Sequence, residues 1–80
     1  MNDEPLKYII VNGSGPPLAI VFSPLLSHRE VASPFNDVVS AGFCYLLAEG
    51  TQNAVAWGES VSLGIKSRMK EDSAILSKLI

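Results

Sequence analysis

Large and small side chains alternate along two neighbouring segments, residues 38–49 and 54–65, and few folds are compatible with that pattern. Successive residues of a strand point to opposite faces of a sheet, so each segment predicts a long strand. The second segment has a bulky face at its odd positions, whereas its even positions are all small: Ala54, Ala56, Gly58, Ser60, Ser62 and Gly64. The two segments therefore predict an antiparallel hairpin with one bulky face and one nearly bare face.

The turn of this hairpin, residues 50–53, has the sequence GTQN. Directly opposite residues of an antiparallel pair point the same way, so bulky faces match only when paired residue numbers sum to an even value. That condition favours a loop of three or five residues over one of four. A bulge at Gly58 would change the parity, because it adds one unpaired residue to the strand.

The N-terminal part predicts a second hairpin, and the C-terminal part predicts a helix. Residues 6–11 (LKYIIV) and 18–23 (LAIVFS) are rich in strand-forming side chains, and the glycines and prolines of residues 12–17 form the turn. After Lys66 the apolar residues recur at helical spacing, which predicts an amphipathic helix to the chain end. Its apolar side consists of Met69, Ile75, Leu76, Leu79 and Ile80.

The segment FSPLLSHREVASPF, residues 22–35, predicts a short helix between the two hairpins. Ser27 precedes Glu30 by three residues, which is the spacing of a capping box. Pro34 should end the helix after one or two turns. This explanation leaves His28, the single histidine, without an assigned role, and we prefer the structural interpretation of the segment to a catalytic one.

The order of these elements predicts one α+β domain over residues 1–80, with the arrangement ββαββα. The sheet would be antiparallel and built from the two hairpins, with a short central helix and a C-terminal amphipathic helix. Residues 1–5 are polar and acidic and are expected to be disordered.

Size and composition predict self-association. A chain of 80 residues has a thin stability margin, and small domains often gain stability from disulfides, metals or oligomerisation. Cys44 is the single cysteine, which excludes an internal disulfide, and one cysteine with one histidine cannot supply a four-ligand zinc site. With 48% apolar and 18% charged residues, the chain is expected to form a homo-oligomer, at least a dimer.

Other classes of function receive little support. The net charge is −2, and the strongest basic cluster is only Lys66, Arg68 and Lys70, so we expect no nucleic-acid partner. No run of 18 apolar residues is present, and the start of the chain does not resemble a signal peptide, so we expect no membrane span and a cytoplasmic protein. We expect no metal and no cofactor; GSG at residues 13–15 precedes two prolines and a strand, unlike a phosphate loop.

The candidate binding residues are Tyr45, Trp57 and Glu59, and no catalytic residue is predicted. Glu59 lies on the bulky apolar face, where an ionised carboxylate needs a partner. We favour an irregularity at Gly58 that turns Glu59 outward. The other interpretation pairs Glu59 with Tyr45, His28 or an arginine, which could come from a second chain. The predicted role is a protein-binding one; the alternative is a small enzyme or ligand-binding domain with a site between subunits around these three residues.

The stretches VVSAGF (residues 38–43) and GESVSLGIKSR (residues 58–68) resemble a group of short uncharacterised proteins encoded in bacterial and prophage genomes. The resemblance covers the second hairpin and the start of the last helix. It implies a small accessory protein of phage or prophage type rather than a metabolic enzyme. It assigns no activity to any residue.

Overall fold

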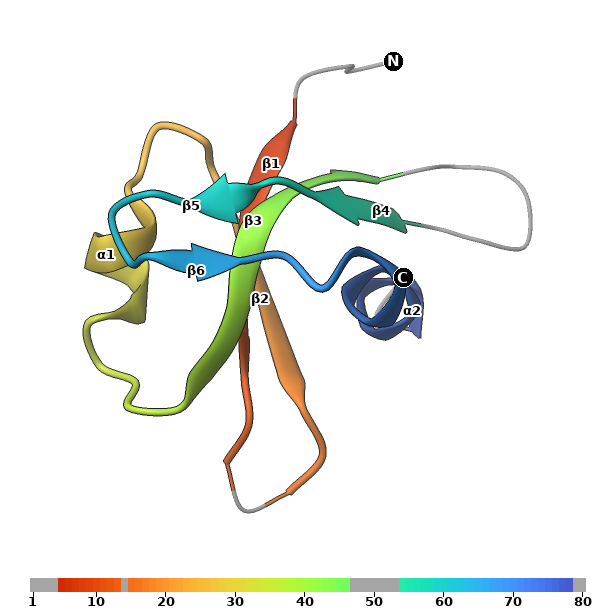
Figure 1. Cartoon of the computed structure of the whole chain (residues 1–80), viewed down its shortest axis with the longest axis horizontal. Coiled ribbons are helices and arrows are strands. Elements are labelled where there is room, and N and C mark those ends of the chain that lie inside the picture. The colour runs from red at the N-terminus through yellow and green to blue at the C-terminus, as the bar shows by residue number, and fades with distance from the viewer. Residues whose placement is uncertain (1–4, 14, 47–53, 79–80) are drawn as a thin grey trace.

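The computed structural model describes residues 5–13, 15–46 and 54–78, and these form an α+β fold (Figure 1). The main sheet is antiparallel with the strand order β2-β1-β3-β4. The elements are β1 (Leu6–Val11), β2 (Leu18–Phe22), α1 (His28–Ala32), β3 (Val38–Leu46), β4 (Ala54–Trp57), β5 (Glu59–Ser60), β6 (Ile65–Lys66) and α2 (Met69–Lys78). The predicted α+β class, with two hairpins, a short central helix and a C-terminal helix, is confirmed.

Some predictions concern residues outside this description. They are the disorder of residues 1–4, the last positions of the strand 38–49, the turn 50–53, and the placement of Leu79 and Ile80.

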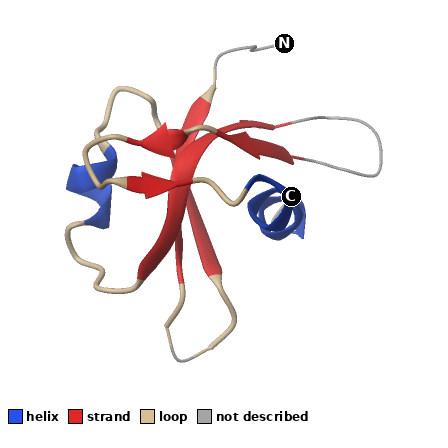
Figure 2. Cartoon of the chain, viewed as in Figure 1, coloured by secondary structure: helices blue, strands red, loops and turns tan. Residues whose placement is uncertain are grey.

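The predicted continuous strand over residues 54–65 is wrong. β4 ends at Trp57, and β5 and β6 form a separate two-stranded sheet, which Figure 2 shows as two short arrows. The chain changes direction at Gly58 (φ 80°) and again at Gly64 (φ 66°). Side chains rarely adopt such positive φ values, so glycine at these positions permits turns that the alternating pattern did not distinguish from a bare strand face. Val61 lies in the turn between β5 and β6 and is 87% exposed.

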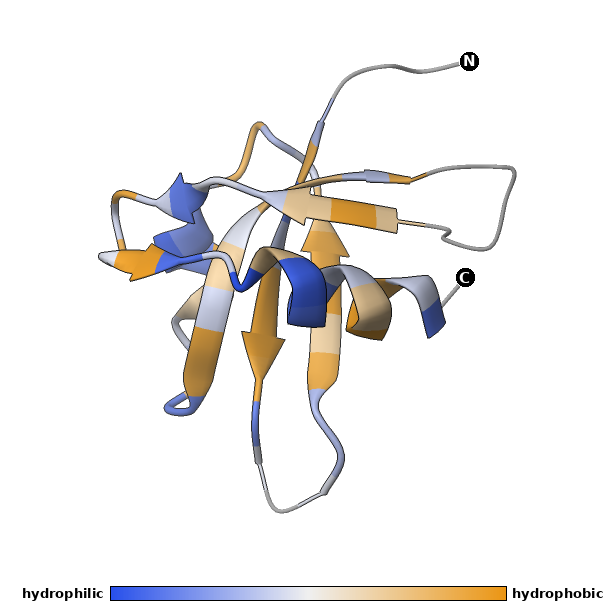
Figure 3. Ribbon diagram, turned by 45° about the vertical axis from the view of Figure 1, so that its right-hand side comes forward, coloured by the Kyte–Doolittle hydropathy of each residue, from blue (hydrophilic) through white to orange (hydrophobic). Residues whose placement is uncertain are grey.

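α2 covers the face of the sheet that carries the small residues of β4. Figure 3 shows the helix lying across the sheet. Ala54 and Ala56 are fully buried, and Leu76 of α2 packs into the same core cluster. This cluster contains Tyr8, Ile10, Ala19, Cys44, Ala54, Ala56 and Leu76. The helix therefore covers the bare face of its own sheet.

The opposite face holds a second core beneath α1. Its buried members are Ile9, Val11, Ala32 and Ala41. Leu63 and Ile65, from the turn after β5 and from β6, pack against it and are partly buried. The β5–β6 unit thus contributes to this core, although it does not extend the main sheet.

The register between β3 and β4 follows the predicted parity. Phe43 is opposite Trp57, and Tyr45 is opposite Val55, so paired residue numbers sum to an even value. Large side chains consequently face large side chains across this pair.

Burial raises the pKa of the Cys44 thiol to about 11, so this small core residue stays protonated at neutral pH.

The capping box at the start of α1 is confirmed. The Glu30 amide donates to Ser27 Oγ at 3.1 Å, and the Ser27 amide donates to Glu30 Oε1 at 3.2 Å. Both residues satisfy helix-end groups locally, which is the structural role predicted for them. The helix ends at Ala32, two residues before Pro34.

Replacing Ser27 with alanine should lower the free energy of unfolding by about 0.5–2 kcal/mol, because one N-terminal amide loses its acceptor. Urea denaturation measures the change. Ser33→Ala is the matched control, since Ser33 is an exposed serine just past the other end of the helix. Equal stability of the two variants would show that the cap contributes nothing.

His28 has a structural place in the fold. Its side chain is 4% exposed, and Nε2 lies 2.8 Å from the carbonyl oxygen of Gly42. A carbonyl only accepts hydrogen bonds, so Nε2 is the donor. Burial lowers the pKa of His28, although the bond to Gly42 opposes this effect.

The lowered pKa of His28 predicts a stability that falls with acidification. The unfolded chain takes up a proton near the ordinary pKa of 6.5, before the folded protein does. The neutral ring therefore contributes stability above that pH, and the contribution is lost as pH falls below it. Urea denaturation between about pH 7.5 and pH 5.5 should show this loss. His28→Gln should reduce the slope of the free energy of unfolding against pH. An unchanged slope would assign the pH dependence to other groups.

Candidate aromatic binding surface

Five rings from β2, α1, β3 and β4 form a continuous row on the face of the sheet that α1 partly covers. We call this set the aromatic row: Phe22, His28, Phe43, Trp57 and Tyr45. The His28 ring makes edge contacts with Phe22 and Phe43, at centroid distances of 5.5 and 5.8 Å. Trp57 stacks on Phe43 at 5.0 Å and on Tyr45 at 5.9 Å. Each ring thus restricts the orientation of the ring beside it.

Strand periodicity and register explain how the second half of this row forms. Phe43 and Tyr45 are two residues apart on β3, so both side chains point to the same face. Trp57 is opposite Phe43 on β4, and stacks on both rings. The alternating pattern therefore brought Tyr45 and Trp57 together as a candidate binding pair. Phe22 and His28 join the row only because the chain folds back over the sheet after β2.

The aromatic row changes from buried to exposed along its length. His28 is buried, Phe43 and Trp57 are half-buried, and Tyr45 is 37% exposed. Trp57 Nε1 is buried and has no hydrogen-bond partner among the residues that the structure describes. Buried indole N–H groups usually find an acceptor. Because Trp57 Nε1 has no acceptor among the described residues, stacking on Phe43 and Tyr45 is what holds the indole. Tyr45 and Trp57 form the open end of the row.

Glu59 lies apart from this row. It is exposed, at the start of β5, and its register partner on β6 is Lys66. The positive φ of Gly58 comes directly before it. The favoured interpretation, an irregularity at Gly58 that turns Glu59 outward, agrees with this placement. The binding role assigned to Tyr45, Trp57 and Glu59 stays a prediction.

Because Glu59 is exposed, Glu59→Gln should change the free energy of unfolding by less than about 0.5 kcal/mol. The small effect should hold at neutral and at acidic pH, since neither the folded nor the unfolded chain buries the carboxyl group. Denaturant melts at both pH values measure it. A larger or pH-dependent loss would show that Glu59 has a partner.

A buried polar network links α2 to β1, and no local sequence pattern predicts it. Tyr8 Oη donates to Asp72 Oδ2 at 2.5 Å and lies 2.6 Å from Ser67 Oγ. Asp72 is fully buried, and Arg68 contacts its Oδ1 through Nε at 3.1 Å and through a second nitrogen at 3.0 Å. Burial and the bond to Asp72 both raise the pKa of Tyr8.

This network anchors the helix rather than forming an open site. The Arg68 amide also donates to Asp72 Oδ2 at 3.0 Å, so the carboxylate caps the first turn of α2 while it holds Tyr8. An aspartate in the first turns of a helix is favourable for the helix dipole, but that local rule does not indicate these partners. Tyr8 and Asp72 are 64 positions apart, and no local pattern connects them.

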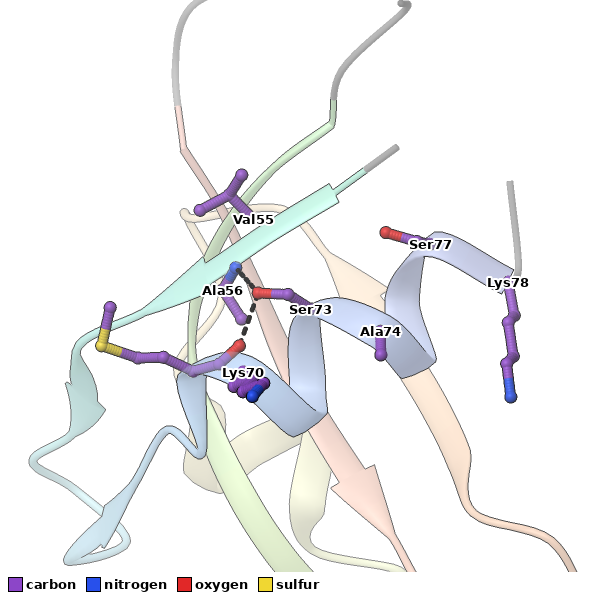
Figure 4. A pocket seen from close by; sticks show the side chains of 8 residues that line it. Val55, Ala56, Lys70, Ser73, Ala74, Ser77 and Lys78 are labelled. Atoms are coloured by element: carbon purple, nitrogen blue, oxygen red, sulfur yellow. Dashed lines mark hydrogen bonds between the residues drawn. The ribbon is translucent and has the colours of Figure 1, made fainter. Parts of the chain in front are cut away.

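An open groove of about 690 Å³ lies between β4 and α2 (Figure 4). Its lining is formed by Val55, Ala56, Met69, Lys70, Ser73, Ala74, Ser77 and Lys78. The Ser73 hydroxyl is already engaged, because it accepts from the Ala56 amide and donates to the Met69 carbonyl (Figure 4). Ser77 likewise bonds the backbone of Ala54. The serines of the groove thus hold the helix against the strand.

The described residues contain no group of three or more His, Cys, Asp and Glu side chains that could hold a metal ion. None of the helices described is long and apolar enough to cross a membrane.

Comparison with known proteins found no matching family model, no matching curated protein and no matching solved structure.

Proposed function

We propose that the protein is a small cytoplasmic accessory protein that binds other proteins and acts as a homo-oligomer. The observation that carries the proposal is the open end of the aromatic row, where half-buried Trp57 stacks on the more exposed Tyr45. Tyrosine and tryptophan offer large, rigid contact surfaces and are enriched at protein interfaces. The resemblance of the second hairpin to short bacterial and prophage proteins supports an accessory, phage-related role.

The surroundings of the row favour an apolar protein segment as the partner. Val55 is opposite Tyr45 on the same face and is half-buried. The cation in register with the row is Lys7, which is opposite Phe43 on β1. Its Nζ donates to the Leu26 carbonyl oxygen at 2.8 Å. Stacking of nucleic-acid bases normally accompanies a positively charged groove, and the chain has a net charge of −2. A peptide with apolar side chains fits these surroundings better than a polyanion.

Exposed apolar side chains support self-association. The most exposed large ones are Leu18 (52%), Leu25 (93%), Val61 (87%) and Met69 (57%). Together with an apolar fraction of 48% in a chain of 80 residues, these side chains favour burial against a second copy. Sedimentation equilibrium at micromolar concentration tests this part of the proposal. A monomer mass that does not depend on concentration would contradict it.

Selection of peptides from a displayed random library tests the binding role. Peptides bound by the wild-type protein should bind Tyr45→Ser about tenfold more weakly or worse, because Tyr45 is the accessible ring of the stacked pair. The fluorescence of Trp57, the single tryptophan, should change on binding. Val61→Ser is the matched control, since it removes an 87% exposed apolar side chain away from the row. Equal affinity of the selected peptides for both variants would refute the proposed surface.

A further inference from the structure

The two edges of the main sheet differ in what covers them. At the β4 edge, the Ala56 amide donates to Ser73 Oγ at 2.8 Å, and the Ala54 amide donates to Ser77 Oγ at 3.1 Å. Two serines of α2 thus take the place of a further strand. At the other edge, β2 pairs with β1, and no other strand described in the structure joins it.

The hydrogen-bond pattern identifies the outward-facing groups of β2. The Asn12 amide donates to the Asp37 carbonyl. The register shift after Ile10 places its extra residue on β3, so the alternation along β1 continues, and even-numbered residues of β1 bond toward β3 and odd-numbered ones toward β2. Since Ile9 is opposite Ile20, the backbone groups of Ala19 and Val21 point away from β1. The same alternation, continued across β3, turns the amides of β4 that the serines bind outward, which supports the assignment.

Nothing in the sequence of β2 protects this edge. Natural edge strands commonly carry a lysine, a proline or a bulge that prevents pairing with another chain. The strand LAIVF has no charge and no proline, and its pairing with β1 is regular. Pro17 and Pro24 lie just outside it, so unobstructed pairing is limited to the strand and its immediate flank.

We propose that β2 pairs with β2 of a second copy, antiparallel and about a two-fold axis at Ile20, to give a continuous eight-stranded sheet. Ala19 of each copy would then exchange two backbone hydrogen bonds with Val21 of the other. Leu18, 52% exposed in one chain, would lie opposite Phe22 of the second copy. The strand is uncharged, so no like charges meet. This inference rests on the proposed homo-oligomer and specifies its interface.

The covered β4 edge explains why pairing would stop at two copies. Sheet extension continues into a fibre only when each chain has two free edges. Here the helix serines occupy the β4 edge, and among the described strands one edge of the main sheet remains open in each chain. A closed dimer follows, with the open ends of both aromatic rows left free for a partner.

Disulfide trapping tests the interface. Across the two-fold axis, the two Ile20 residues would form a non-hydrogen-bonded pair with Cα atoms about 4.5 Å apart, within the range that a disulfide spans. Ile20→Cys should therefore cross-link at least about tenfold faster than Leu25→Cys under mild oxidation, because the dimer raises the local thiol concentration. Leu25 is the matched control, being 93% exposed and outside β2. Cys44 is buried, with a pKa raised to about 11, so it should not react.

A second pair of variants guards against a folding artefact. Val21→Pro removes one outward amide that has no partner in the described structure, whereas Val21→Ala shortens the side chain and keeps the amide. Both should retain the wild-type circular dichroism, and only Val21→Pro should shift sedimentation toward monomer. The wild-type protein could be an oligomer in which Ile20→Cys cross-links no faster than Leu25→Cys and which Trp57→Glu dissociates. That result would overturn the β2 interface and retain the proposed homo-oligomer. A wild-type monomer would overturn both.

Discussion

Asp72→Ala is expected to lower the free energy of unfolding by about 2–4 kcal/mol, one of the two largest effects of any single substitution predicted for this protein. The carboxylate is fully buried and accepts from Tyr8 Oη, from the Arg68 amide and from the Arg68 side chain. Removing it leaves a buried hydroxyl with Ser67 as its remaining partner and uncaps the first turn of α2. The Arg68 side chain is 36% exposed and can return to water, which limits the loss.

Glu71→Ala is the matched control for this substitution. Glu71 is the adjacent acid, its side chain is 69% exposed, and it contacts Arg68 at 3.3 Å. Such surface ion pairs contribute about 0–1 kcal/mol. Urea denaturation compares the two variants, and a cycle with Tyr8→Phe measures the coupling between Tyr8 and Asp72. If both alanine variants lose the same stability, the buried network is not what anchors the helix.

Gly42→Ala is the other substitution with a large expected cost. A Cβ atom at this position would lie 2.5 Å from the Trp57 carbonyl oxygen and 3.2 Å from Ser67 Cβ. The first neighbour is backbone, so β3 or β4 must shift to make room. Overpacking of this kind costs about 1–3 kcal/mol or more, and each kcal/mol lowers the Tm of a domain of this size by about 4–8 °C.

Gly13→Ala separates this steric effect from the general effect of losing a glycine. A Cβ at Gly13 would meet no atom within 4 Å, so a methyl group fits without any movement. Its Tm should stay the same or rise slightly, because alanine restricts the unfolded chain. Thermal melts of both variants measure the difference. Similar Tm values would mean that the contact between residue 42 and Trp57 relaxes at little cost.

The Gly42 variant also connects the packing to the proposed surface. Gly42 precedes Phe43, which stacks on Trp57 in the aromatic row. A shift between β3 and β4 would therefore change the Trp57–Tyr45 stack as well as the stability. We expect Gly42→Ala to weaken peptide binding in parallel with its lower Tm, whereas Gly13→Ala should leave binding unchanged.

The sequence alone determined the elements whose causes are local. The capping box needs only Ser27 and Glu30, three positions apart, and the structure reproduces both of its hydrogen bonds. Strand periodicity likewise placed Tyr45 and Trp57 on one face, because side-chain direction along a strand repeats every two residues. The α+β class and two of the five rings of the aromatic row follow from these short-range rules.

Tertiary structure decided the features that depend on distant partners. A small residue in a strand pattern means either a bare face or a turn, and only the packing around Gly58 showed that β4 ends there. Asp72 reads as an ordinary helix-start acid until the fold brings Tyr8 to it across 64 positions. The serines of α2 appear as polar helix residues until Ser73 bonds the edge of β4. In each case the local residue pattern permits several partners, and the free energy of burying specific distant groups together selects one.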